Sequence, residues 1–481
     1  MNRKSKFIRR LERVLGEDYV ISHPDELFVY EYDGSIDRAF PSVVVFPNSV
    51  EQIVDLMRLA NQYEVPVVTR GSGTGLSGGA IASSGGLQIA LTRMNAILSI
   101  DIANKSAIVE PGVINLKLDE AARKHQLRYA PDPSSQSACT LGGNIAENAG
   151  GPHCLAYGTT TNHVLGMEVV LENGSKTWLG GRLRESKGYD LRGAFVGSEG
   201  TFGVATKIIL RLLQSPPVTK TYLGVFSCVA LACEAVSLII SEGLIPAAME
   251  IVDSLTINAI QKTNDVGLPK DAGSVLLIEL EGRIGEVEEQ GEKVEELLKL
   301  VGVLEYRLAS EKLEREVLWK TRKGALGALG NLAPNYYLVD GVVPRTRLVE
   351  ILEKVNLIGE EHGIKIANVF HAGDGNIHPC ILFDERKSGE LERVIQVGGE
   401  ILEACVALGG TLSGEHGIGL EKKAYMPLVF SPRDLELMLQ VRKVFAPAGR
   451  LNPGKIFPDA IAYDYRQQRE AVRNAGPGSY L

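Results

Sequence analysis

One glycine-rich segment limits the folds open to this chain more than any other feature. Residues 70–79 read Arg-Gly-Ser-Gly-Thr-Gly-Leu-Ser-Gly-Gly and directly follow the apolar run 65–69, which predicts a strand. A glycine run at the end of a strand lets backbone amides approach a phosphate group closely. The segment therefore predicts a strand and loop that bind a phosphorylated ligand, and the alternative is a flexible turn.

This loop contains the spacing Gly-x-Gly-x-x-Gly, from Gly73 to Gly78, which is typical of nicotinamide dinucleotide sites. In such sites a helix begins directly after the glycines. Here residues 79–86 are mostly glycine, alanine and serine, and the next predicted element is a strand over residues 87–91. We therefore expect a pyrophosphate-binding loop between two strands, not a nicotinamide fold.

Two further glycine-rich segments follow. Residues 131–151 form a long polar stretch with little helix or strand signal, and such stretches in compact domains are usually functional loops. Residues 197–204 precede a predicted strand over residues 205–212. Three such loops in one domain predict one extended dinucleotide that is bound along its length.

Two short segments nearer the C-terminal end carry different chemistry. His371 and His378 flank a Gly-Asp-Gly-Asn turn, and Glu415 and His416 lie among glycines. Strands predicted at 368–370 and 379–383 place the two histidines close to opposite one another across that turn.

His371, His378 and Glu415 therefore predict a metal site with open coordination positions, suited to Zn, Mn or Fe. A metal there would bind substrate oxygens and lower the pKa of a hydroxyl group. His416, which is not needed as a ligand, is then the predicted catalytic base. The alternative is a group of loop histidines that only pack.

Composition excludes several classes of protein. With 481 residues, of which 44% are hydrophobic, the chain can fill a large core and should form two or more domains. A net charge of -8 argues against a nucleic-acid binder, and no apolar run approaches the length of a membrane span. The six cysteines contain no Cys-x-x-Cys pair, which argues against a disulfide scaffold or an iron-sulfur protein. Free cysteines predict a soluble cytoplasmic protein.

The basic segment 3–15 has two interpretations: an amphipathic helix that binds membrane surfaces, or a solvated first helix with one buried face. We favour the second. The pattern from residue 220 onwards alternates between strand and helix, which predicts a sheet covered by helices.

Together these segments resemble flavoproteins of the vanillyl-alcohol oxidase type, also called the p-cresol methylhydroxylase (PCMH) type, over nearly the whole chain. The segments that resemble the FAD loops of that family are 70–79, 141–151, 197–204 and 451–455. Within the family, segments 371–378 and 413–419 resemble the metal-dependent D-2-hydroxy-acid dehydrogenases, which include FAD subunits of glycolate oxidases and D-lactate dehydrogenases.

The resemblance implies an α+β fold: a two-lobed PCMH-type FAD-binding domain with an α/β cap domain built on an antiparallel sheet. We expect the FAD-binding domain at residues 1–217, the substrate and metal cap at 218–425, and a C-terminal return to the FAD domain at 426–481.

The resemblance also implies FAD as the cofactor. Some relatives attach flavin covalently through His or Cys, and the first FAD loop here has neither, so we expect noncovalent FAD. His153 and Cys154 are candidates to face the flavin, and Cys139 is expected to be a small packed side chain. The implied FAD contacts are Arg70, Gly71, Ser72, Gly73, Thr74, Gly75, Leu76, Ser77, Gly78, Pro133, Ser135, Thr140, Leu141, Gly142, Asn144, Asn148, Gly150, Gly151, Tyr157, Gly158, Glu199, Gly200, Gly203, Val204 and Asn452.

For the substrate, the resemblance selects Arg322, on a helix predicted over residues 313–329, to hold a carboxylate. Periodicity alone leaves Lys320 and Lys323 as competitors. In hydroxyglutarate-specific relatives a lysine and an asparagine stand where this chain has Leu338 and Cys380, and their loss favours a small monoacid.

The implied reaction is oxidation of glycolate or D-lactate to the 2-keto acid. The alternatives are a larger D-2-hydroxy acid, or a flavin-carrying electron-transfer subunit with its chemistry on a partner. Electrons would pass to a quinone or to a redox partner: a second flavin-type subunit, an iron-sulfur subunit or an electron-transfer flavoprotein. Any membrane association would be peripheral and would come through such partners.

Overall fold

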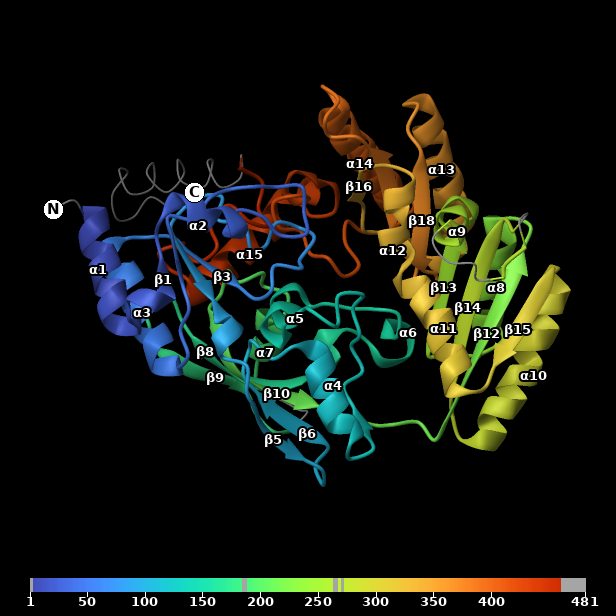
Figure 1. Ribbon diagram of the computed structural model, residues 1–481, viewed down its shortest axis with the longest axis horizontal. Helices are drawn as coiled ribbons and strands as arrows, with labels where there is room; N and C mark the ends of the chain where they lie inside the picture. Colours follow the sequence, from blue (N-terminus) through green and yellow to red (C-terminus); the bar gives the residue numbers. More distant parts are fainter. Residues whose placement is uncertain (1–2, 184–187, 263–266, 270–271, 460–481) are drawn as a thin grey trace.

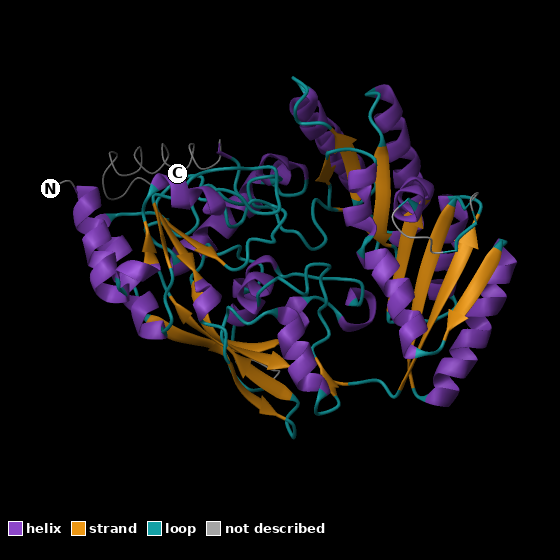
Figure 2. Cartoon of the chain, in the orientation of Figure 1, coloured by secondary structure: helices purple, strands orange, loops and turns teal. Residues whose placement is uncertain are grey.

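The computed structural model describes residues 3–183, 188–262, 267–269 and 272–459, which form two lobes (Figure 1). The N-terminal part of the chain forms one lobe around two sheets, and the yellow and orange part forms the other around one large sheet. Long loops of the first lobe face the second (Figure 2). No described helix is both long and apolar enough to cross a membrane.

The first sheet of the N-terminal lobe has four strands in the order β1 (Val20–Ile21), β2 (Val43–Val45), β4 (Leu87–Ala90) and β3 (Val67–Arg70). Strands β2 and β3 both run parallel to β4. Helices α1 (Arg3–Leu15) and α3 (Val50–Tyr63) share a core with this sheet. Because α1 buries Phe7, Leu11 and Leu15, the basic segment is a solvated first helix with one buried face, as predicted.

The connection from β3 to β4 contains no helix between residues 71 and 86. This confirms the prediction of a glycine-rich loop between two strands. Ser49 caps α3 by accepting a hydrogen bond from the Gln52 amide.

The second sheet is antiparallel, in the order β5 (Ile97–Asp101), β6 (Ser106–Val109), β10 (Val204–Arg211), β8 (Val164–Val170) and β9 (Lys176–Gly180). Helices α4 (Asn115–Arg123) and α5 (Leu141–Glu147) pack their apolar side chains against it. We had predicted little regular structure in the second glycine-rich segment, and α5 corrects that expectation. Thr140 caps α5 by accepting from the Gly143 amide, and this cap offsets the poor helix propensity of two glycines.

The second lobe is built on a nine-stranded sheet that confirms the predicted helix-covered antiparallel architecture. Its main path is β15 (Glu305–Ala309), β12 (Val218–Phe226), β14 (Ser274–Gly282), β13 (Ala248–Asp253), β18 (Ile366–His371), β19 (Asn376–Ile377) and β17 (Gly341–Val342). Off this path, β20 (Pro379–Phe383) pairs with both β18 and β16 (Asn335–Leu338).

Helices cover both faces of this sheet. One face packs against α8 (Val229–Ser241), α10 (Ile284–Val301), α13 (Leu348–Glu361) and α14 (Glu390–Ala407). The other packs against α9 (Ser254–Gln261), α11 (Lys312–Lys323) and α12 (Ala325–Ala328), and α11 and α12 lie on the side of the N-terminal lobe (Figure 1). The single helix predicted over residues 313–329 is therefore wrong. It is interrupted at Gly324, because glycine is a weak helix former.

Buried ion pairs join the two lobes. Arg128 donates two hydrogen bonds to the Glu281 carboxylate, at 2.7 and 2.6 Å, and the Tyr157 hydroxyl donates to the same group at 2.7 Å. His153 lies between Asp132 and Glu279, 3.0 and 2.9 Å from their oxygens. These contacts tie loops of the first lobe to β14 of the second.

The C-terminal segment contacts both lobes. Met426 and Leu435 belong to the core of the second lobe, whereas Phe445 and Leu451 pack into the cores of the first. The domain boundaries that we predicted stay a prediction, although β12 begins at Val218.

Asn452 fastens this segment to the glycine-rich loops. Its buried side chain donates to the Gly79 carbonyl at 2.9 Å and to the Glu199 carbonyl at 2.7 Å, and it accepts from Lys455 Nζ at 3.0 Å. One amide therefore joins three segments that are distant in sequence.

We predict that Asn452→Ala lowers the free energy of unfolding by about 1 to 3 kcal/mol, because it leaves the buried Gly79 and Glu199 carbonyls without this donor and removes one of the two acceptors of the Lys455 ammonium. Thermal melting of the purified protein measures the effect. Asn95→Ala is the matched control, since Asn95 is exposed and donates only to the nearby Thr92 carbonyl. Equal melting temperatures for the two variants would contradict the prediction.

Candidate functional site

A cavity of about 420 Å³ lies where the two lobes meet, and it joins the glycine-rich loops to the histidine and glutamate segments. All three glycine-rich segments contribute to its wall. The second lobe contributes Arg322, His378, Glu415 and His416. The predicted FAD loops and the predicted catalytic and metal-binding segments therefore line the same cavity.

Of the residues assigned to FAD, those that line this cavity are Arg70, Gly71, Ser72, Gly73, Thr74, Gly75, Leu76, Pro133, Ser135, Thr140, Gly142, Asn144, Gly150, Glu199, Gly200 and Asn452. Those outside its lining are Ser77, Gly78, Leu141, Asn148, Gly151, Tyr157, Gly158, Gly203 and Val204. Tyr157, for example, is engaged by Glu281 at the contact between the lobes.

The loops that form the cavity are packed so closely that side chains would not fit at several glycines. A Cβ at Gly71 would overlap Thr140 Oγ1. Gly417 has a φ of +89°, and a Cβ there would lie 2.6 Å from Glu147 Oε2. Glu199 accepts from the Ile418 and Gly419 amides at 2.7 Å each, which holds the segment 413–419 against the third glycine-rich loop.

His371, His378 and Glu415 converge on one point. Their ligand atoms all lie within 4.8 Å of one another. Glu415 Oε1 is 3.2 Å from His371 Nε2 and 3.3 Å from His378 Nε2. This donor set fits a divalent metal, because two imidazole nitrogens and one carboxylate oxygen share one small volume.

The strand register differs in detail from our prediction. His371 pairs with Asn376, and His378 lies between β19 and β20, because the return strand is divided into two short pieces. The two imidazole rings nevertheless meet edge to face, with centroids 5.0 Å apart.

The electrostatics around the set favour a bound cation. Although burial opposes protonation, Glu250 and Glu415 raise the pKa of His371 well above its usual range. Against the same effect of burial, His371 and His378 hold the pKa of Glu415 well below its usual range. A positive charge, proton or metal, is therefore stabilised between these side chains.

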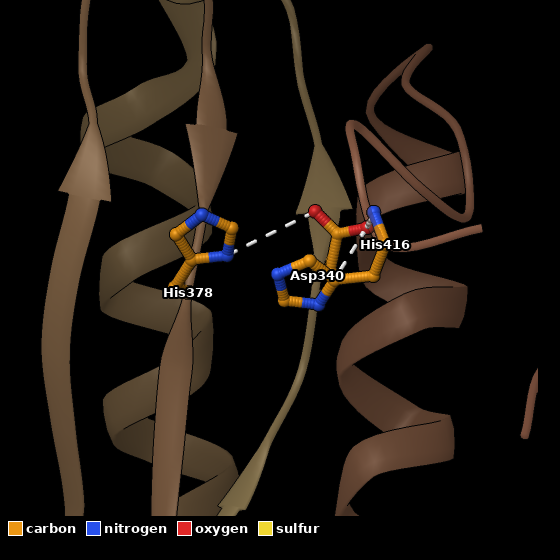
Figure 3. Close-up of side chains that lie close together, drawn as sticks. All are labelled: Asp340, His378 and His416. Atoms are coloured by element: carbon orange, nitrogen blue, oxygen red, sulfur yellow. Dashed lines mark hydrogen bonds and ion pairs between the residues drawn. The ribbon is translucent and has the colours of Figure 1, made fainter. Parts of the chain in front are cut away.

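Asp340 lies beside His378 and His416 (Figure 3). It lies between β16 and β17, is fully buried, and its carboxylate oxygens are 3.8 Å from His378 Nδ1 and 4.0 Å from His416 Nδ1. Oδ2 also accepts from the Ser413 hydroxyl at 2.6 Å and from the Gly414 and His416 amides at 3.1 and 3.0 Å. Our sequence analysis did not single out Asp340, although an acidic residue that follows Leu338 and Val339 is a usable signal.

His416 stacks on His378, with ring centroids 5.0 Å apart and planes 3° from parallel. Its Nε2 is 3.8 Å from Glu415 Oε1, and its Nδ1 faces Asp340. Burial lowers the pKa of His416 to about 4. The imidazole is therefore neutral near pH 7 and can accept a proton.

Arg322 reaches the cavity from α11 but is already paired. Its Nη2 is 2.6 Å from Glu250 Oε2, and its buried Nε has no hydrogen-bond partner within the described part of the chain. The neighbouring Lys323 also lines the cavity, with Nζ 3.7 Å from Asp132. Lys320 is not part of the lining. Glu250 is a second residue that our sequence analysis missed, and its signal was an acid between the apolar residues Met249 and Ile251 of β13.

His153 and Cys154 are not part of the cavity lining, and His153 is engaged by Asp132 and Glu279. The idea that they face the flavin therefore finds no support in this cavity. Cys139 does line it, as a buried side chain beside Asn144, and burial raises the pKa of its thiol. A neutral thiol is a poor nucleophile.

This chain is similar to several known proteins. The family model for the FAD binding domain matches residues 41–180, and the model described as "FAD linked oxidases, C-terminal domain" matches residues 215–456. The glycolate oxidase subunit GlcD of Escherichia coli (strain K12) is 43% identical over 459 residues, which are 95% of this chain and 92% of that protein.

A second relative is the mitochondrial D-lactate dehydrogenase [cytochrome] of Arabidopsis thaliana, 29% identical over 95% of this chain and 81% of that protein. Among solved structures, p-cresol methylhydroxylase with bound substrate has a TM-score of 0.80 at 20% identity and covers 95% of this chain and 97% of its own, which shows a shared fold.

These matches confirm the resemblance on which the expected fold rested. The cavity, its glycine-rich walls and both family models lead to one conclusion: this chain belongs to the FAD-linked oxidases and is an FAD-linked oxidoreductase with the PCMH-type fold.

Proposed function

We propose that this chain oxidises a small D-2-hydroxy acid, glycolate or D-lactate, to the 2-keto acid with FAD and a divalent metal. The observation that carries the proposal is the single cavity that the FAD loops share with His378, Glu415, His416 and Arg322. An electron-transfer subunit whose chemistry lies on a partner would have no use for that second set. The names of the relatives, glycolate oxidase subunit and D-lactate dehydrogenase, support the substrate class.

Each residue of the set has a distinct task. FAD held by the glycine-rich loops would supply the hydride acceptor, and a metal held by His371, His378 and Glu415 would make the substrate hydroxyl more acidic. His416 Nε2, on the side of Glu415, takes the hydroxyl proton, and Asp340 beside Nδ1 stabilises the imidazolium that results. Arg322, whose side chain reaches the cavity, offers its guanidinium to the substrate carboxylate.

The wall of the cavity supports a small substrate. Leu338 and Cys380 face each other as a β16–β20 pair, and Leu338 lines the cavity. An apolar side chain there offers no partner to a second carboxylate, and burying an unpaired charge is costly. A larger D-2-hydroxy diacid is the alternative that this feature disfavours.

The acceptor that we propose is a protein or a quinone. The described residues contain no cysteine group that could hold an iron-sulfur relay, so electrons must leave from the flavin itself. The name of the Escherichia coli relative describes a subunit, and that of the Arabidopsis relative specifies a cytochrome. Both support transfer to a partner.

We predict that FAD is noncovalent, because Cys139, a cysteine in the cavity wall, is held as a neutral thiol. Acid precipitation of the purified protein should release all of its flavin into the supernatant, where absorbance identifies it as FAD. Yellow colour that stays in the pellet would contradict the prediction.

We predict that anaerobic glycolate or D-lactate bleaches the flavin absorbance, whereas L-lactate and D-2-hydroxyglutarate do so far more slowly. Treatment with a chelator should abolish bleaching, and added Zn²⁺ or Mn²⁺ should restore it. Bleaching that survives complete removal of metal would refute the metal, and equal rates with the diacid would refute the proposed substrate size.

We predict that His416→Asn keeps FAD and metal but slows flavin reduction by about 10² to 10⁴, the usual contribution of a positioned base. Stopped-flow absorbance measures the rate. His362→Asn is the control, because His362 pairs with Glu400 outside the cavity. Reduction of the His416→Asn enzyme at the rate of the control would remove His416 from the mechanism.

A further inference from the structure

Glu250 is an unusual residue for its position. It lies in the middle of β13, a strand of the nine-stranded sheet, and its side chain is fully buried. The flanking Met249 and Ile251 are core residues. A buried carboxylate is costly unless it is paired and hydrogen-bonded.

Both oxygens of Glu250 are engaged, and by different parts of the proposed site. Oε1 is 2.7 Å from His371 Nδ1, across a pair of residues that stand opposite each other in β13 and β18. Oε2 is 2.6 Å from Arg322 Nη2 on α11. One carboxylate therefore contacts both His371, a candidate metal ligand, and Arg322, the candidate residue for binding the substrate carboxylate.

The first contact decides which nitrogen of His371 can bind a metal. A carboxylate oxygen only accepts, so the proton of a neutral His371 resides on Nδ1. Nε2 then presents its lone pair toward Glu415, whose Oε1 is 3.2 Å away. Carboxylates in this position orient metal-binding histidines and increase their basicity.

The second contact fixes the guanidinium. Arg322 is itself buried, and Glu250 is the carboxylate that neutralises it. With Nη2 held by Glu250, another N–H of the guanidinium is the donor for an incoming carboxylate. The orientation of that donor therefore depends on Glu250.

We propose that Glu250 is a positioning residue that couples metal binding to recognition of the substrate carboxylate, through His371 and Arg322 respectively. It touches neither substrate nor metal. This inference rests on the proposed function, because it takes His371 as a ligand and Arg322 as the carboxylate-binding side chain.

The test compares Glu250→Gln with Asp253→Asn in the full-length, FAD-loaded protein. Asp253 is a partly buried carboxylate at the end of the same strand; it caps α9 and accepts from Asn368 on β18, so this control removes the same charge nearby. We measure the dissociation constant of Zn²⁺ for protein stripped of metal, by competition with a coloured chelator. Then we measure kcat and KM for glycolate with an artificial dye as acceptor at saturating Zn²⁺.

For Glu250→Gln we expect Zn²⁺ affinity to fall by about 10- to 100-fold, as for other residues that orient metal ligands. We expect the KM for glycolate to rise about tenfold, because Arg322 loses the ion pair that orients it and its charge-assisted contact with the substrate carboxylate is weakened. FAD content should stay at the wild-type value. Asp253→Asn should leave the Zn²⁺ affinity and the KM unchanged.

Should Glu250→Gln fail to fold with FAD, Glu250→Asp takes its place. It keeps the charge but is one methylene shorter and cannot reach both partners, so we expect smaller losses in the same two quantities. Wild-type values of either quantity in the variant that folds would overturn the inference, and so would equal losses in Asp253→Asn.

His371→Ala, measured in parallel, separates this inference from the proposed function. If His371→Ala loses Zn²⁺ while Glu250→Gln keeps wild-type affinity, the proposed metal set stands and the role of Glu250 is refuted. If His371→Ala binds Zn²⁺ as the wild type does, the metal set itself is wrong and the inference falls with it.

Discussion

One carboxylate oxygen, Oδ2 of Asp340, holds the part of the chain on which the site depends. It accepts from the Ser413 hydroxyl, from three successive backbone amides at residues 414–416, and from the Lys422 ammonium. Although burial opposes ionisation, His416, Lys422 and His378 keep the pKa of Asp340 well below its usual range. A loop rich in glycine thus acquires one conformation, and Glu415 and His416 are placed by its backbone rather than by their own side chains.

Two buried carboxylates lie next to the histidines of the candidate site. Asp340 faces Nδ1 of His378 and of His416, while Glu250 engages Nδ1 of His371. In each case the other ring nitrogen is turned toward Glu415. Both acids lie outside the cavity lining. Glu250 is hydrogen-bonded to His371, whereas Asp340 lies 3.8 and 4.0 Å from His378 and His416 without a hydrogen bond to either ring.

The cavity itself exists only because two lobes are held together. The Arg128 and Glu281 pair, with His153 between Asp132 and Glu279, fixes the sheet of the second lobe against loops of the first. The segment 413–419 adds a second connection through Glu199. Oxidation of a substrate by a flavin requires the two to lie at van der Waals distance, and a cavity whose walls come from both lobes meets that need.

Much of this could be predicted from the sequence, for reasons that are local. Glycines after a strand, with no helix to follow, indicated a phosphate-binding loop, because backbone approach depends only on the residues in that loop. The spacing of His371 and His378 about a turn placed two imidazoles together, because cross-strand neighbours are close in any hairpin. The register within that hairpin and the short helix α5 were missed, since each depends on a single backbone hydrogen bond or cap.

The tertiary structure determined the contacts between residues that are far apart in the sequence. Glu250 and His371 are 121 residues apart, and Asp340 and Ser413 are 73 apart. These pairs meet because the strand order of the nine-stranded sheet brings β13 beside β18 and places the end of β16 under the loop 413–416. The sequence by itself indicated the glycine-rich loops and the group formed by His371, His378, Glu415 and His416. The strand order of the sheet determined which carboxylate lies beside each histidine, because a buried ion pair forms between groups that are close in the fold, however far apart they are along the chain.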